Sequence, residues 1–165
     1  MAKTFELRPI YPVSGGDDAD FDFRNWTIGA SETFKRGAFL VSGGNGEVDE
    51  AGTNPSAIIG VALADAADYA WQHSTLGDVV PSMPFATADT EFRGTLVGTI
   101  SDVSAVIGAT YGVTKQVSGY WAVDYSKSAS NQRVTITGVE DEAVDGDINI
   151  PVTFTILPAN RVVIK

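Results

Sequence analysis

The amino-acid sequence predicts an all-β protein, a small β-barrel or β-sandwich with one short helix and an extended N-terminal arm. Composition is the first reason, because 17 glycines and abundant Thr, Val, Ile and aromatic residues among 165 positions favour strands and tight turns. Segment length is the second, because apolar stretches of roughly four to eight residues recur between turn residues. Their regular spacing is the third, since it is typical of barrels and sandwiches.

The first 30 residues differ in character from the rest of the chain. Two prolines and two glycines between residues 9 and 16 interrupt this stretch and favour an extended backbone. The aromatic and aliphatic side chains around them need a surface to cover. We therefore divide the chain into an N-terminal arm at residues 1–30 and a single β-barrel-like domain at residues 31–165.

Short strands follow one another in the first half of the expected domain. Residues 34–41 form one strand, and the Gly-rich loop at residues 42–46 supplies a hairpin turn, because Gly and Asn tolerate positive φ. Residues 48–53 form the returning strand. The apolar run at residues 57–63 predicts a strand buried on both faces. Residues 64–78 hold no sustained helical period and predict a loop with one turn at most.

The second half continues the pattern around one expected helix. Residues 91–98 alternate apolar with small or polar residues, although their glycines weaken them as a strand. Residues 101–112 predict the short helix, because Ser101 or Asp102 can cap it and Gly112 can end it. Further strands are expected at residues 120–124, 133–139, 152–157 and 161–164. We see no repeat of fixed period and no linker, so one barrel accounts for this domain.

The charge balance argues against two classes of partner. Lys and Arg total 11 against 21 Asp and Glu, and the formal net charge of −10 repels phosphate backbones and anionic lipid surfaces. Charged residues occupy the N-terminus where a signal peptide would be apolar, and no apolar run reaches the roughly 18–20 residues of a bilayer span. We therefore expect a soluble protein that binds neither nucleic acid nor membrane.

The sequence offers few groups for catalysis or metal binding. The chain has no cysteine. Its single histidine, His73, could act as a general base only beside a nucleophile, and the sequence contains no Gly-x-Ser-x-Gly motif to supply one. Acidic residues follow the Gly-rich loop where a phosphate loop would carry Lys and Ser or Thr. Acidic clusters at residues 17–22 and 140–147 lack calcium-loop spacing, while a glycosidase-like carboxylate pair stays an open alternative, because the fold sets its separation. We expect no enzyme, metal or cofactor.

Aromatic and apolar side chains of the arm, with one tryptophan of a loop, are the candidates for a binding surface. Trp121 lies within an expected strand, so we place it in the core. Trp26 and Trp71 lie in the arm and in a loop, where aromatic residues often mark interfaces. The candidate interface residues are Phe5, Leu7, Tyr11, Phe21, Phe23, Trp26 and Trp71.

Several segments carry a resemblance to a known family. They read Thr-Phe-Lys-Arg-Gly-Ala-Phe-Leu-Val at 33–41, Gly-Glu-Val at 46–48, and Ile-Ile-Gly-Val-Ala-Leu-Ala-Asp-Ala at 58–66. Later segments are Phe-Arg-Gly-Thr at 92–95, Tyr-Gly-Val at 111–113, Gly-Tyr-Trp-Ala-Val-Asp at 119–124, and Arg-Val-Thr-Ile at 133–136. In this order they resemble the small head-decoration, or cement, proteins of tailed bacteriophages over residues 33–157.

The resemblance implies a virion protein on the outer surface of an expanded icosahedral head, where it stabilises contacts between major-capsid subunits. Its implied partners are the major capsid protein and other copies of the chain, in a trimer or another small cluster at a local symmetry axis. An extended aromatic arm suits this role, because it can add a strand or lie in a groove. The alternative is a carbohydrate- or host-surface-binding β-domain displayed on a virion, which predicts an exposed aromatic platform near Trp71.

Overall fold

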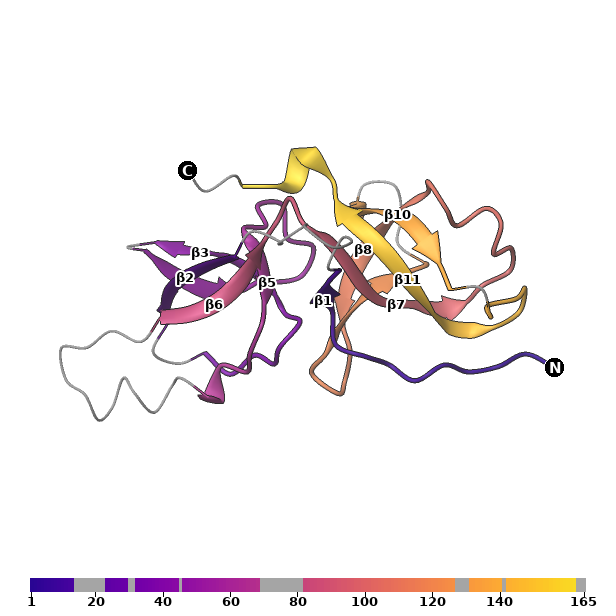
Figure 1. Ribbon diagram of the computed structural model, residues 1–165, viewed down its shortest axis with the longest axis horizontal. Coiled ribbons are helices and arrows are strands. Elements are labelled where there is room, and N and C mark those ends of the chain that lie inside the picture. The colour runs from indigo at the N-terminus through magenta and orange to yellow at the C-terminus, as the bar shows by residue number, and fades with distance from the viewer. Residues whose placement is uncertain are drawn as a thin grey trace.

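The computed structural model describes residues 1–13, 23–29, 32–44, 46–68, 82–126, 131–140 and 142–162. Strands make up nearly all of its regular structure, which confirms the all-β class. Figure 1 shows two curled sheets side by side, one built mainly of purple to pink strands and the other of rose to yellow strands. We call them the N-terminal barrel and the C-terminal barrel.

The N-terminal barrel is a closed ring of strands in the order β2-β4-β3-β5-β6. Its strands are β2 (Phe23–Ile28), β3 (Phe39–Gly44), β4 (Glu47–Glu50), β5 (Gly60–Ala62) and β6 (Ser82–Thr87). Neighbours are antiparallel except β2 and β4, whose parallel pairing completes the ring. The expected hairpin joins β3 to β4, and the expected double-sided burial of β5 is confirmed.

The C-terminal barrel closes in the order β7-β11-β10-β8-β9, because β9 pairs back onto β7 in parallel. Its strands are β7 (Glu91–Thr99), β8 (Thr110–Lys115), β9 (Trp121–Asp124), β10 (Val134–Val139) and β11 (Ile148–Ile156). The two-residue strand β1 (Tyr11–Pro12) pairs with the start of β7, and the 3-10 turn η2 (Pro158–Asn160) follows β11.

The two barrels share one connectivity. In each, the first strand pairs with the third in parallel and with the fifth, the second pairs with the third and fourth, and the fourth pairs with the fifth. The register also agrees, since Val61 faces Ala86 as Thr135 faces Thr155. Other matching pairs are Leu40–Gly60 with Tyr111–Val134, Ser42–Val48 with Val113–Val123, and Arg24–Phe85 with Phe92–Phe154. The chain is therefore a structural repeat, which the search for a fixed sequence period did not find.

The same turn precedes the second strand of each barrel. Gly37 and Gly108 both have a φ of 82°, and each is followed by an alanine and then by the strand. Their N–H groups donate to the carbonyls of Ala62 and Ile136, both at 2.8 Å, which ties the turn to the fourth strand. Glycine is favoured here because side-chain-bearing residues rarely adopt this φ.

Residues 101–112 correct the sequence analysis, because they form successive turns and the start of β8 instead of a helix. Asp102, expected to cap that helix, closes a turn instead, since its Oδ1 accepts a hydrogen bond from the N–H of Ala105 at 3.2 Å. The backbone then leaves the helical path at Gly108. The bond from the N–H of Gly108 to β10 replaces the next helical hydrogen bond.

The division of the chain also differs from the expected one. Residues 23–28, expected within the arm, form β2 and pair with β4 and β6. Residues 31–165, expected as one barrel, contribute strands to two. One contiguous core joins the barrels, because the ring of Phe39 lies 5.5 Å from that of Trp121 and 6.4 Å from that of Phe154. Trp121 is buried, as expected.

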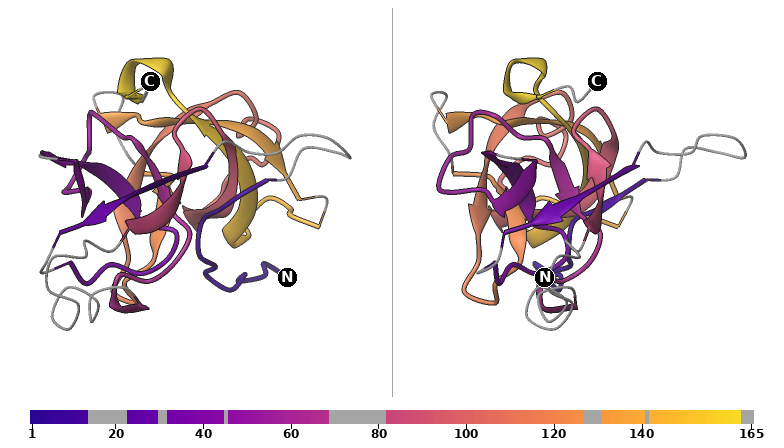
Figure 2. Two further views of the ribbon diagram at one scale, coloured as in Figure 1. Left: turned by 60° about the vertical axis from the view of Figure 1, so that its left-hand side comes forward. Right: turned by 90° about the vertical axis from the view of Figure 1, so that its left-hand side faces the viewer.

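Both ends of the described chain cross to the opposite barrel. The first residues lie along the C-terminal barrel (Figure 1), and the turn η2 lies on the opposite side of the molecule from them in both views of Figure 2. After β11, the carbonyl of Asn160 accepts a hydrogen bond from the N–H of Ile58, and Val162 donates to the carbonyl of Ile58, both at 2.8 Å. The residues after β11 are thus bound to the N-terminal barrel.

Candidate interface surface

The N-terminal segment, residues 1–13, is bound along its length to the C-terminal barrel (Figure 1). The N–H of Phe5 donates to the carbonyl of Ile148 at 2.9 Å, and the N–H of Val13 donates to that of Glu91 at 2.9 Å. Between them β1 pairs with β7. The first part of the expected arm therefore covers its own chain.

A buried carboxylate anchors the start of this segment. Asp147 Oδ1 accepts a hydrogen bond from the N–H of Lys3 at 2.7 Å, and Oδ2 accepts one from the N–H of Val144 at 3.0 Å. These bonds, from Lys3 first and then Val144, stabilise the charged carboxylate and lower the pKa of Asp147 below its ordinary value. Asp147, a member of the acidic cluster at residues 140–147, therefore has a structural role, because it binds two backbone N–H groups.

Ile10 wedges the N-terminal segment between the barrels. It is only 2% exposed. On one side, a Cβ placed on Gly37 would lie 2.6 Å from the Ile10 nitrogen, so the backbones touch. On the other side, a Cβ on Gly94 would lie 3.1 Å from Ile10 Cγ1. Both glycines therefore leave room for the N-terminal segment at the contact between the two barrels, which we call the seam.

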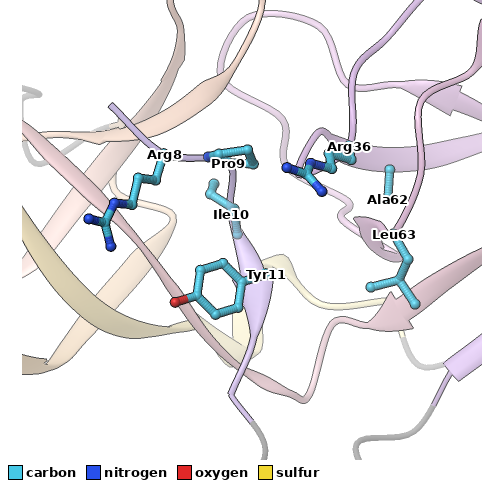
Figure 3. A pocket seen from close by; sticks show the side chains of 7 residues that line it. All are labelled: Arg8, Pro9, Ile10, Tyr11, Arg36, Ala62 and Leu63. Carbon is cyan, nitrogen blue, oxygen red and sulfur yellow. The ribbon is translucent and has the colours of Figure 1, made fainter. Parts of the chain in front are cut away.

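An open cleft of about 460 Å³ lies beside this wedge (Figure 3). We call it the arginine cleft, and its lining residues are Arg8, Pro9, Ile10, Tyr11, Arg36, Ala62 and Leu63. Arg8 and Arg36 lie on opposite sides of Pro9 and Ile10 in Figure 3. Arg8 and Arg36, from separate parts of the sequence, thus both line one cleft. The Arg36 side chain points toward Pro9 and Ile10 in Figure 3, and that of Arg8 points away from them.

The environment of the cleft is set by its neighbours. The N–H of Arg36 donates to Asp65 Oδ1 at 2.7 Å. The guanidinium of Arg93 donates to the hydroxyl of Tyr11 at 3.3 Å, and its Nε lies 3.7 Å from Glu140. Tyr11 is 41% exposed at the mouth of the cleft. The nearby carboxylates therefore already have partners of their own.

A second polar contact fastens the two barrels together. Glu50 on β4 accepts hydrogen bonds from Lys115 Nζ at 2.7 Å and from Trp121 Nε1 at 2.8 Å. The N–H of Glu50 in turn donates to Glu32 Oε2 at 3.0 Å. Burial, followed by the charges of Asp49 and Glu50, raises the pKa of Glu32 above its ordinary value, although the bond from Glu50 opposes this. The seam is thus held by charged groups as well as by rings.

The structure separates the residues expected to form one interface. Phe5 and Leu7 are half-buried on the N-terminal segment, and Phe5 packs against the core. Trp26 lies in β2 of the other barrel, where its ring stacks on Phe85 at 6.2 Å. Among the members whose side chains the structure describes, Tyr11 is the exposed one. The side chain of Phe23 lies outside the described part, as do Phe21, Trp71 and His73.

Two further expectations concern metals and membranes. Within the described residues no three His, Cys, Asp or Glu side chains gather as a metal site would require. The same part of the chain contains no helix long and apolar enough to cross a membrane. The acidic residues at positions 17–22 lie outside the described residues.

Sequence reasoning missed the arginine cleft, because Arg8 and Arg36 each look like an ordinary charged residue. The Lys-Arg-Gly motif was the available signal, since Gly37 makes the turn that receives Ile10. The Gly-Ala pairs at 37–38 and 108–109 could likewise have revealed the repeat. Comparison of the chain with protein-family models, with curated proteins and with solved structures found no match.

Proposed function

We propose that this chain is a structural decoration protein that binds the outer surface of an expanded icosahedral phage head and stabilises contacts between major-capsid subunits. The proposal assigns it a binding role, with the major capsid protein and other copies of the chain as partners. No enzymatic step belongs to it.

The repeated barrel is the observation that carries the proposal. A protein that staples two neighbouring subunits needs two contact surfaces on one rigid body. Two barrels of equal connectivity, joined by one core, supply such surfaces. Attachment at two points also turns modest contacts into tight binding, because the second contact forms at high effective concentration.

The family motifs give further support. The Lys-Arg-Gly segment forms the turn before β3, and the Gly-Glu-Val segment begins β4 of the β3–β4 hairpin. The Ile-Ile-Gly-Val-Ala segment is buried and ends in β5. These three lie in the N-terminal barrel and the later motifs lie in the C-terminal barrel, so the resemblance extends over both. The net charge of −10 suits a surface outside a shell that holds DNA.

Co-sedimentation with expanded, undecorated heads of the cognate phage tests the proposal, with unexpanded heads as the control. We expect saturable binding at a fixed ratio per capsid subunit, and better survival of decorated heads on heating. Absence of saturable binding to expanded heads would overturn it. Retention of the same protein on a glycan surface would then support the carbohydrate-binding alternative.

A further inference from the structure

We propose that the arginine cleft binds an extended protein segment that carries carboxylates, with Arg8 and Arg36 as the two recognition residues. The inference deepens the proposed function, on which it rests for the identity of the segment as part of the capsid protein. The chemistry of the cleft itself does not depend on that identity.

The first reason is unused charge. Neither guanidinium of this pair forms a hydrogen bond, ion pair or ring contact with any residue that the structure describes, although the chain carries 21 acidic residues. Arg8 and Arg36 bond through their backbone N–H groups, to Thr95 and Asp65, and leave the side chains available. An arginine prefers a carboxylate or phosphate, which its planar fork can bind through two hydrogen bonds.

The second reason is the wall between the arginines. Pro9, Ile10, Ala62 and Leu63 give the cleft an apolar floor, and Tyr11 adds a ring with a hydroxyl. A volume of about 460 Å³ falls in the range of roughly 300–1,000 Å³ that is usual for ligand sites. An extended peptide that places an apolar side chain between two acidic ones fits this order of cation, apolar floor and cation.

The third reason separates a peptide from a polyanion. The net charge of −10 repels phosphate backbones at long range, so a nucleic acid gains little from two isolated arginines. A segment with one or two carboxylates meets a weaker repulsion and can still form charge-assisted hydrogen bonds. Local positive charge within a negative field therefore selects a sparsely charged protein segment.

Titration with an end-capped hexapeptide of alternating Asp and Leu tests the inference, followed by amide and arginine Nε–H shifts in the full chain. We expect saturable shifts at Ala62, Leu63 and both arginines. Each of Arg8→Gln and Arg36→Gln should weaken binding about tenfold, as loss of a charged hydrogen bond does. The same peptide with Asn in place of Asp should not bind.

Lys3→Gln is the matched control, since it removes one positive charge from the same N-terminal segment outside the cleft. Its binding should stay within about twofold of the wild type, because screened charges at a distance contribute little. Equal weakening by all three variants, or equal binding of the Asn peptide, would overturn the inference. Retained amide spectra exclude misfolding, since neither arginine side chain supports the fold.

The capsid test distinguishes the two proposals. If wild type and both arginine variants bind expanded heads equally, the decoration role stands and the assignment of the cleft to a capsid-protein segment fails. If the peptide binds in the cleft but no variant binds heads, the decoration role fails and acidic-segment recognition remains.

Discussion

The two barrels have the same connectivity and register, yet they differ in what covers the turn before the second strand. At Gly37 the backbone of Ile10 packs directly against the turn. At Gly108 no atom of the described residues, apart from its chain neighbours, lies within 4 Å of where a Cβ would stand, and neighbouring Ile107 is 57% exposed. The fold of the turn therefore does not need the cover. The N-terminal segment is an addition that makes one copy of the repeat different from the other.

Side chains diverge between the copies in the same way. Phe39 begins β3 and is fully buried at the seam, whereas the matching position in β8 is Thr110, which is half-buried. The C-terminal barrel has two strands of nine residues, β7 and β11, while no described strand of the N-terminal barrel exceeds six. The N-terminal barrel is thus smaller and depends more on the seam, which four experiments can test.

The largest expected effect is at Phe39. Phe39→Ala should lower the free energy of unfolding by about 3–5 kcal/mol, because it opens a cavity among buried rings. Thr110→Ala, at the matching place, should cost less than about 1 kcal/mol. Chemical denaturation of both variants measures the difference. Equal losses would mean that the seam does not support the N-terminal barrel.

The second comparison sets Gly37→Ala against Gly108→Ala. Both residues have the same positive φ, so each alanine should cost about 1–2 kcal/mol in backbone strain. The Cβ at Gly37 would also collide with Ile10, which should add about 1–3 kcal/mol of overpacking. Denaturation midpoints give both values. An equal loss of stability in the two variants would contradict this comparison, because it would mean that the contact with Ile10 adds nothing to the cost at Gly37.

The third experiment detaches the N-terminal segment from the C-terminal barrel. Asp147→Asn removes a charge that holds two N–H groups, and should lower Tm by roughly 2–6 °C. Hydrogen exchange at Lys3 and Phe5 should speed up, while the N-terminal barrel stays protected. Glu142→Gln, an exposed change in the same loop, is the control.

The same carboxylate predicts a pH dependence. Its pKa is lowered from 3.8, so its contribution is complete above the unfolded value and is lost as the pH falls through the folded value, below 3.8. The variant and the wild type should therefore converge in Tm under acid conditions. A constant gap from neutral pH down to acid would contradict the assignment.

The smallest effect is expected at Glu32. Its pKa is raised above 4.5, so ionisation costs stability as the pH rises through the folded value. Glu32→Gln keeps an oxygen for the Glu50 N–H and should gain at most about 0.5 kcal/mol at neutral pH, because solvent screens this half-buried group. Thermal melts at two pH values measure it, with Glu47→Gln as control. A loss of stability at neutral pH would instead make the charge favourable.

Local signals in the sequence predicted local structure well. The β3–β4 hairpin follows from a loop of glycines, and β7, β9 and β10 follow from alternating or β-branched runs. The helix prediction failed because Val103 and Val106 satisfy helical spacing and also suit a single turn above a barrel end. Gly108 then binds β10, which no local pattern records.

The repeat and the cleft were harder to predict. In the repeat, matching positions share backbone geometry but carry different side chains. Leu40 and Tyr111 occupy matching places and share little chemistry. The arginine cleft depends on where the N-terminal segment binds, and that is fixed by partners such as Asp147 and Thr95 far along the chain. The predicted interface residues were chosen by side-chain type, and the sequence did not indicate which barrel each of them would join.

The crossed ends of the chain have a mechanical consequence. The N-terminal segment is bonded to the C-terminal barrel, and Asn160 and Val162 are bonded to Ile58 of the N-terminal barrel. A force that pulls the barrels apart must therefore break the hydrogen bonds of both terminal segments, and it must also extend the connection between β6 and β7. The force is shared among separate segments of backbone. We therefore expect the two barrels to resist separation although no covalent cross-link joins them.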